Sequence, residues 1–190
     1  MPMSDKKTQL LEAAIDLFSK EGFWNTSTAR ISKHAKVATG TLFNYFPSKE
    51  ALIDEVYVTL KHEAMDAMFQ GPAGPDDLEA LFKQVYVNYV RWGVANPVRF
   101  KLLEQLKLSD LVSQETQQRI YSELSDTKEL FRSAIRDGKL VDVTVDYLTA
   151  LITVNIETSV KYAVDNKLKG KALDKFCDKG FALLWKGITP

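Results

Sequence analysis

The segment from residue 26 to residue 46, TSTARISKHAKVATGTLFNYF, constrains the fold of this chain more than any other part. It predicts two short helices joined by a tight turn. Apolar residues recur at helical spacing on the inner face of each helix: Ile31 and Ala35 in the first, Leu42, Tyr45 and Phe46 in the second. Because Pro47 forces the residue before it out of helical geometry, the second helix is only about two turns long.

Polar residues occupy the other side of the second helix. Thr39, Thr41 and Asn44 lie away from its apolar residues. Residues that favour helix starts stand before each helix: Thr26 or Ser27, then Ala38 or Thr39, then Ser48 for the helix after Pro47. A short helix that is held against a neighbour and carries small polar side chains outward suits insertion into the major groove of DNA.

Residues 22–52, GFWNTSTARISKHAKVATGTLFNYFPSKEAL, resemble the N-terminal DNA-binding domain of TetR-family transcriptional regulators. The run TGTLFNYFPSKE, residues 39–50, resembles the recognition helix of that family and the start of the helix after it. The resemblance implies a cytoplasmic homodimer that binds a double-stranded, pseudo-palindromic DNA operator, most often as a repressor. It implies no enzyme activity and no cofactor.

The resemblance also assigns residues to the DNA contact. The set that it implies is Ser27, Thr28, Thr39, Gly40, Thr41, Phe43, Asn44, Tyr45 and Lys49. Ser27 or Thr28, Tyr45 and Lys49 occupy positions that touch phosphate in the family, whereas Thr39, Thr41 and Asn44 face the groove.

Two positions depart from the family pattern. Lys36 stands where the turn usually has glycine, and a non-glycine residue with positive φ costs on the order of 1 kcal/mol. A slightly different or slightly strained turn is therefore expected. Phe43 stands where the family often has tyrosine near phosphate, and phenylalanine has no hydroxyl group to donate.

Charge is distributed unevenly although the net charge is zero. Residues 1–49 carry seven Lys and Arg against four Asp and Glu, and the remainder carries eighteen against twenty-one. This N-terminal part, which we call the head, is therefore mildly basic, and a local excess of positive charge suits phosphate binding. The chain has no long apolar run of the kind that crosses a membrane, its first eight residues do not resemble a signal peptide, and its single cysteine, Cys177, fits a reducing cytosol.

The rest of the chain predicts more helices, and the fold class is all-α with about nine helices. Residues 1–48 form the DNA-binding domain, and residues 49–190 form a ligand-binding and dimerisation domain. The expected helices after the head cover residues 48–69, 77–95, 97–106, 113–136, 145–165 and 172–188. The first of these begins in the head and continues into the body, so the join is rigid.

A set of aromatic and polar residues on the middle helices has two readings. The set is Tyr86, Tyr89, Trp92, Phe100, Tyr121, Asn155 and Ser159. These residues form either a packed core or an apolar ligand site with a few polar anchors. The family resemblance implies an effector in the body, which here would be small and largely apolar.

The resemblance further implies that the last two helices of each chain form a four-helix dimer interface. The residues expected there are Ile152, Ile156, Phe176, Gly180, Phe181 and Leu184, with Gly180 permitting close approach of another helix. Metal binding is not expected, because His62 and Asp66 have no second histidine or cysteine near them. Two alternatives stay open: a related regulator controlled by a protein partner, and a helical small-molecule enzyme or carrier.

Overall fold

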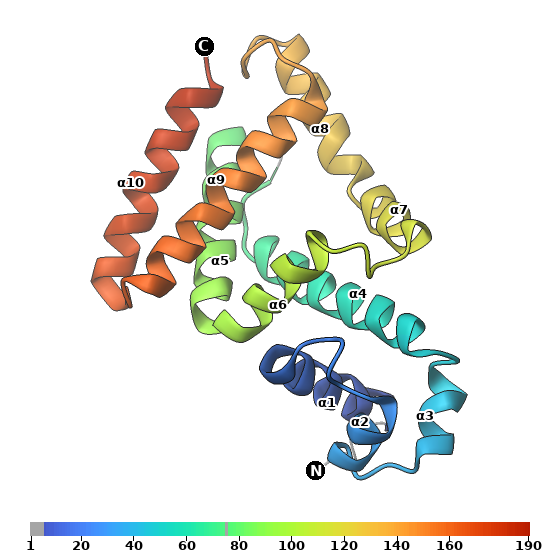
Figure 1. Cartoon of the computed structure of the whole chain (residues 1–190). Helices are drawn as coiled ribbons and strands as arrows, with labels where there is room; N and C mark the ends of the chain where they lie inside the picture. Colours follow the sequence, from blue (N-terminus) through green and yellow to red (C-terminus); the bar gives the residue numbers. More distant parts are fainter. Residues whose placement is uncertain (1–5, 75) are drawn as a thin grey trace. The chain divides into compact units, whose positions relative to one another are not determined.

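The computed structural model describes residues 6–74 and 76–190, and within them the chain has ten α-helices and no strand (Figure 1). This confirms the all-α fold class, with one helix more than the nine expected. The chain forms two compact units. One contains the described part of Met1–His62 together with Val98–Ile120, and the other contains Glu63–Pro97 with Tyr121–Pro190. The functional boundary at residue 48 stays a prediction.

The first unit contains the segment predicted to be the DNA-binding head. Its helices are α1 (Lys6–Glu21), α2 (Thr28–His34), α3 (Thr39–Tyr45), the start of α4 (Lys49–Met68), α6 (Pro97–Lys107) and the first part of α7 (Gln114–Glu123). Helix α1 packs against α2 and α3, and α2 packs against α3. Gly22, with φ 80°, ends α1 in the left-handed conformation that glycine adopts without steric cost. The helical spacing of apolar residues such as Leu10, Ala14 and Phe18 predicts a helix over residues 5–20, and its expected start at Asp5 lies outside the described residues.

Polar contacts tie the remaining helices of this unit to the head. The ammonium group of Lys7 lies 2.6 Å from the carboxylate of Glu55, which joins α1 to α4. The Arg99 guanidinium of α6 forms an ion pair with Glu12 of α1. Helix α6 therefore has a direct connection to the DNA-binding head, which the sequence did not indicate.

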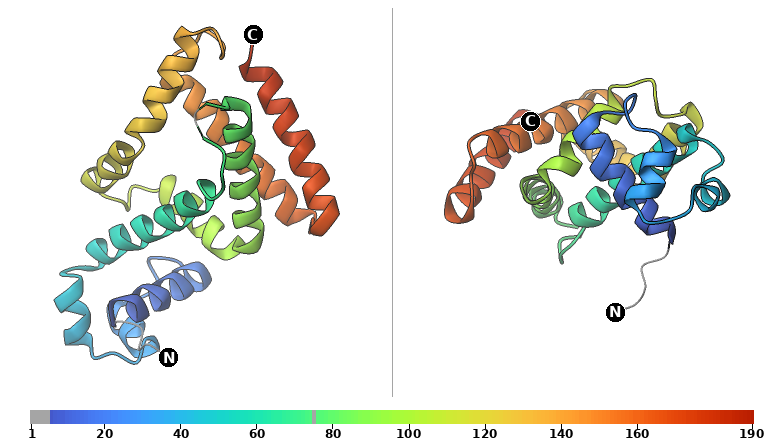
Figure 2. Two further views of the ribbon diagram at one scale, coloured as in Figure 1. Left: turned by 180° about the vertical axis from the view of Figure 1, so that it is seen from behind. Right: turned by 60° about the horizontal axis from the view of Figure 1, so that its bottom comes forward.

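The second unit is a helical bundle. It contains the end of α4, α5 (Leu78–Ala95), α8 (Ser125–Arg136), α9 (Val145–Asp165) and α10 (Gly170–Ile188). Helices α5, α9 and α10 pack against one another, and α8 packs against α9 (Figures 1 and 2). Asp77 and Thr144 cap α5 and α9 by accepting hydrogen bonds from the backbone N–H groups of Ala80 and Tyr147.

The expected single helix over residues 113–136 is wrong, because the chain breaks at Leu124 into α7 and α8. The N–H group of Leu124 donates to the carbonyl of Tyr121, three residues back, at 3.3 Å. This tighter bond interrupts the α-helical ladder. Ser125 and Asp126 follow at once, and residues of these types favour a helix start over a helix interior.

Gly93 allows α5 to approach α9 closely. A Cβ atom at this position would lie 2.3 Å from Cγ1 of Val160. Gly93→Ala is expected to destabilise the fold by about 1–3 kcal/mol, because the added methyl group overpacks a filled contact. Thermal unfolding measures the loss. Gly187→Ala in α10 is the matched control, because nothing lies within 4 Å of its added Cβ atom, and it should stabilise the helix slightly. Equal stability of both variants would contradict the close approach.

Candidate nucleic-acid interface

The turn between α2 and α3 is built from local hydrogen bonds. Ser27 caps α2, and its Oγ atom accepts a hydrogen bond from the N–H of Arg30 at 3.2 Å. At the other end, Val37 donates to the carbonyl of Ser32 at 2.9 Å and Lys36 donates to that of Lys33 at 3.2 Å. This pair of bonds is the Schellman motif, which requires the residue directly after the helix C-cap to adopt the left-handed conformation. Lys36 takes that conformation with φ 56°, which confirms a turn that costs some backbone strain.

Helix α3 is held by two buried side chains. Leu42 is fully buried, and Phe46, which ends the helix with φ −132°, is almost fully buried. The expectation that Tyr45 shares this inner face is wrong, because its side chain is 40% exposed. The backbone leaves helical geometry at Phe46, so that ring takes the interior place and Tyr45 stays at the edge beside it.

The outer side of α3 is open. Gly40 and Asn44 are four residues apart, share a face and lie opposite the buried Leu42. Among the other predicted contact residues of this helix, Thr39 and Phe43 are exposed, and Thr41 is half-buried. Among the residues predicted to face the groove, Asn44 is thus exposed and lies opposite the buried Leu42.

The predicted phosphate contacts surround the same helix in sequence. Ser27 is exposed, and since its Oγ atom accepts from Arg30, its hydroxyl hydrogen is available for a further acceptor. Thr28 is half-buried. The Lys49 ammonium, at the start of α4, donates to the backbone carbonyl of Phe23. This bond holds the lysine on the segment between α1 and α2 and uses only one of its three donor hydrogens.

The positive charge of the head is partly neutralised within the chain. Lys20 and His34 both face the carboxylate of Asp16, and Arg30 pairs with Glu21. Lys33 and Lys36 are exposed and form no ion pair with any other described residue. Two cations next to the turn thus remain for electrostatic attraction of a polyanion.

In the second unit, three of the predicted ligand residues meet. The hydroxyl group of Tyr86 lies 2.8 Å from Oγ of Ser159, which in turn donates to the backbone carbonyl of Asn155, one helical turn earlier, at 2.9 Å. Since the serine has one hydrogen, Tyr86 is the donor of its pair. Burial raises the pKa of the Tyr86 phenol, and the bond to Ser159 partly offsets this. Oδ1 of Asn155 is buried without a hydrogen-bond partner among the described residues.

The other predicted ligand residues do not join this group. Tyr89 and Trp92 are buried and contact each other, with 5.6 Å between ring centroids. Tyr121 is exposed and donates to Asp146 at 2.9 Å, and Phe100 belongs to the first unit. Among the predicted ligand residues, the side chains of Tyr86 and Ser159 therefore meet directly, and Asn155 joins them through its backbone carbonyl.

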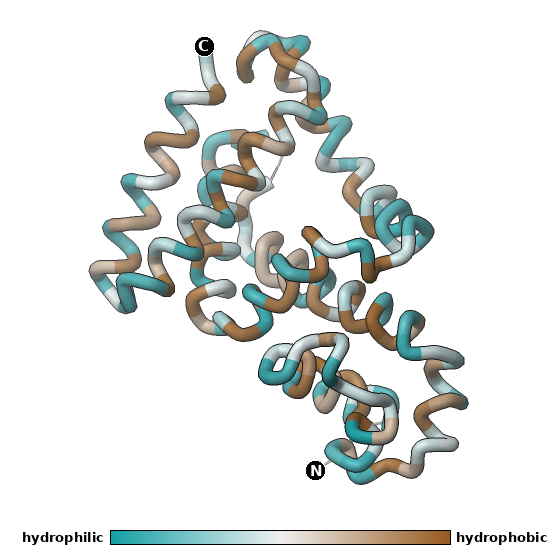
Figure 3. Tube along the Cα trace, in the orientation of Figure 1, coloured by the Kyte–Doolittle hydropathy of each residue, from teal (hydrophilic) through white to brown (hydrophobic). Residues whose placement is uncertain are grey.

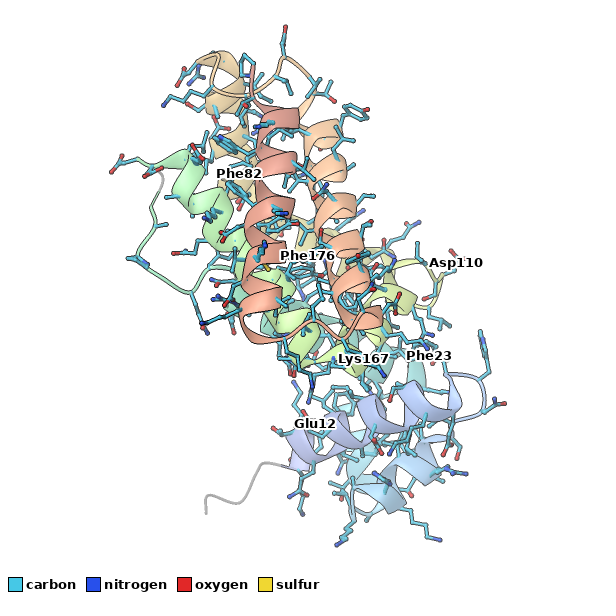
Figure 4. All side chains as sticks on the ribbon, turned by 90° about the vertical axis from the view of Figure 1, so that its left-hand side faces the viewer. Glu12, Phe23, Phe82, Asp110, Lys167 and Phe176 are labelled. Carbon is cyan, nitrogen blue, oxygen red and sulfur yellow. The ribbon has the colours of Figure 1, made fainter. Side chains whose placement is uncertain are left out.

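Most residues predicted for a dimer interface are used inside the chain. Ile152, Ile156, Phe181 and Leu184 are buried in the single chain. A Cβ atom at Gly180 would lie 2.2 Å from the hydroxyl oxygen of Tyr86, so this glycine admits α5 of its own chain. Phe176 is half-buried and stacks on Tyr162 of α9, with 5.3 Å between centroids (Figure 4).

A different apolar surface remains exposed on α9 and α10, and we call it the outer face. It consists of Tyr147, Leu151, Val154, Tyr162, Phe176 and Leu183. The four α9 members follow the spacing i, i+4, i+7 and i+15, which places them in one stripe, and the Tyr162–Phe176 stack joins that stripe to α10. Figure 3 shows apolar residues recurring along both helices. Apart from Phe176, the sequence reasoning missed this face, although its spacing is readable in the sequence.

Other chemistry has little support in the described residues. They contain no group of three His, Cys, Asp or Glu side chains that could hold a metal ion. Burial raises the pKa of the Cys177 thiol to about 11, so it stays protonated at neutral pH. In the same part of the chain, none of the helices is both long and apolar enough to cross a membrane.

Comparison with known proteins agrees with this architecture. Residues 10–56 match the sequence profile of bacterial regulatory proteins of the tetR family. The crystal structure of a protein from Shewanella sp. PV-4 assigned to TetR-family transcription regulators is similar, with a TM-score of 0.89 and 29% identity. The similarity covers 98% of this chain and 99% of that one.

Two curated bacterial regulators match in sequence. The uncharacterized HTH-type regulator YerO of Bacillus subtilis is 27% identical over 136 residues, which are 70% of this chain and 46% of YerO. The HTH-type regulator LuxR of Vibrio harveyi is 43% identical over 51 residues, which are 27% of this chain and 25% of LuxR. The match thus spans less than half the length of these relatives. Regulators of the matching family bind DNA and act as dimers, and are not enzymes. Residues 10–56 thus match the DNA-binding domain of the tetR family, and the chain as a whole has the fold of a bacterial transcription regulator assigned to that family.

Proposed function

We propose that the chain is a dimeric repressor in the cytoplasm that binds a pseudo-palindromic operator and leaves it when a small, largely apolar inducer binds. The exposed face of α3, with Asn44 and Gly40 opposite the buried Leu42, is the observation that carries this proposal. A helix held in this way by its neighbour presents polar groups to base edges in a major groove. Residues 1–48 form the DNA-binding domain in this proposal, and residues 49–190 form the regulatory body.

The dimer contact in this proposal is the outer face of α9 and α10. Large apolar side chains such as Val154 and Leu183 are exposed there in the single chain. A contiguous exposed apolar surface of this kind marks a protein interaction site. A symmetric dimer uses the same face on both copies, and it matches the two-fold symmetry of a pseudo-palindromic operator.

The inducer site in this proposal involves Tyr86, Asn155 and Ser159. The buried Oδ1 of Asn155 has no hydrogen-bond partner within the described residues, and such an atom is costly unless something binds it. A ligand that offers one hydrogen-bond donor on an apolar body would satisfy this oxygen and bury the rest of its own surface among apolar side chains.

Selection of binding sites from a random DNA pool tests the central proposal. An enriched inverted repeat, protected from cleavage over both half-sites, is the expected result. Failure to enrich any sequence, together with no salt-dependent binding of duplex DNA, would refute DNA recognition by α3.

The roles of Asn44 and Lys49 can be separated by substitution. Asn44→Ala should weaken binding to the selected operator by about 1–3 kcal/mol per half-site and relax the base preference there, because it removes a base-edge contact. Lys49→Ala should weaken binding to all duplexes almost equally and reduce the salt slope by about one per half-site, since it removes a phosphate contact.

Binding isotherms at several salt concentrations, on the operator and on a shuffled duplex, measure both effects. Lys175→Ala, which removes an exposed cation of α10 outside the head, is the control and should leave the salt slope unchanged. If Asn44→Ala and Lys49→Ala caused the same sequence-independent loss, Asn44 would not be a base-reading residue.

A further inference from the structure

The segment between α1 and α2 exposes a large side chain that the protein does not use for packing. Trp24 is 83% exposed, whereas the ring of the preceding Phe23 turns inward and lies 5.1 Å from that of Phe18. A single exposed apolar residue is common on protein surfaces. The surroundings of Trp24 therefore decide whether the exposure has a use.

Residues with phosphate-binding chemistry flank Trp24. The carbonyl of Phe23, one residue before it, accepts a hydrogen bond from the Lys49 ammonium at the start of α4. Figure 4 shows Phe23 at the end of α1. Ser27, three residues after Trp24, is exposed and retains a hydroxyl hydrogen for an external acceptor. Trp24 thus lies within a few residues along the chain of two groups that would contact the DNA backbone in the proposed function.

The segment that carries Trp24 is ordered by its own hydrogen bonds. The side-chain amide of Asn25 donates to the carbonyl of Glu21 at 3.1 Å, and the hydroxyl of Thr26 donates to that of Gly22 at 2.8 Å. Both bonds return to the last residues of α1. Because the backbone is fixed before binding, a contact by Trp24 requires little ordering of the backbone on binding.

The chemistry of the indole ring fits the sugar–phosphate backbone. Its Nε1–H group can only donate a hydrogen bond, and a phosphate oxygen is a suitable acceptor for it. Its flat apolar surface suits the carbon face of a deoxyribose, and tryptophan is favoured where one side of a contact is apolar and the other polar. The ring is uncharged, so its contact would release no counterion.

We infer that Trp24 binds the DNA backbone beside the groove that α3 enters. This inference rests on the proposed DNA-binding function and adds a contact that does not depend on base sequence. Trp24→Ala is expected to weaken binding to the operator and to a shuffled duplex alike, by about tenfold or more, since a hydrogen bond to a charged group is lost. The salt slope should stay as in the unmodified protein, unlike that of Lys49→Ala. Trp24→Phe should lose part of this affinity, because it keeps a ring and removes the donor.

Leu108→Ala is the matched control, because Leu108 is also a large exposed side chain, at 87%, and follows α6. It should leave DNA affinity unchanged. If Trp24→Ala bound both duplexes within twofold of the unmodified protein, or if it changed the salt slope as Lys49→Ala does, the inference would be overturned.

Acrylamide quenching of tryptophan fluorescence tests the contact without relying on the stability of a variant. Trp92 is buried and Trp185 is half-buried, so the difference between the unmodified protein and Trp24→Phe reports Trp24. Saturation with the selected operator should protect this component. Unchanged quenching with bound operator would overturn the inference and leave the exposed indole to another partner. Absence of any DNA binding by the unmodified protein would instead refute the proposed function itself.

Discussion

Leu183→Asp is expected to convert the protein from a dimer to a monomer and to reduce operator affinity by about 10²–10⁴-fold, the usual gain from linking two binding sites. Leu183 is 73% exposed in the single chain, so the substitution removes no interior packing. In a symmetric dimer the aspartate would enter the interface from both copies, and a buried carboxylate without a partner opposes association.

Ala182→Asp is the matched control for this prediction. Ala182 is the adjacent residue of α10, is exposed and undergoes the same change in charge, but points about 100° away around the helix. Sedimentation equilibrium measures the oligomeric state, and titration with the full operator and with a half-site measures affinity. A Leu183→Asp protein that remains dimeric, or a monomer that binds the full operator as tightly as the parent, would exclude the outer face as the dimer contact.

The helix-turn-helix could be predicted from the sequence because its determinants are local. The cap at Ser27, the two short apolar faces and the stop before Pro47 all lie within a few residues of the backbone that they shape. Even the unusual turn at Lys36 followed from its position relative to the family pattern, and the Schellman bonds show how the turn is held.

The sequence could not show which side of α9 faces the interior of the chain, because this helix is apolar on more than one side. One stripe includes Leu148 and Ile156, which are buried, and the neighbouring stripe includes Leu151 and Val154, which are exposed. Helical spacing groups each stripe correctly, but only the packing of α5 and α10 determines which one faces inward. Gly180 was assigned to the dimer for a similar reason: a small residue permits close approach without naming the helix that approaches.

The aromatic residues of the body show the same limit of sequence reasoning. A hydropathy pattern cannot distinguish Tyr86 from Tyr121, because both are tyrosines. In the structure Tyr86 is buried and bonded to Ser159, whereas Tyr121 is exposed and bonded to Asp146. The difference arises from contacts between distant segments.

Asn155→Leu is expected to abolish the response to inducer while leaving the fold as stable as the parent or more stable. The substitution replaces a buried oxygen that lacks a partner by an apolar group of similar size, and this removes a desolvation penalty. In the parent, inducer should lower operator affinity by about 5- to 150-fold, the usual range of allosteric coupling. Linkage requires that operator DNA weaken inducer binding by the same factor.

Asn88→Leu provides the contrast on α5, because the Asn88 amide donates to the carbonyls of Met68 at 3.2 Å and Gln70 at 2.7 Å. This variant should lose stability, since two backbone acceptors lose their donor, and should keep its inducer response.

Small phenols, aromatic alcohols and aromatic amides are suitable probes, because each combines an apolar body with a hydrogen-bond donor. Thermal shift identifies the ligand, and operator titration with and without it gives the coupling. If no probe binds, and Asn155→Leu destabilises the fold as Asn88→Leu does, Asn155 has a structural role and control by a protein partner becomes the better explanation, since the buried oxygen would then be satisfied within the chain.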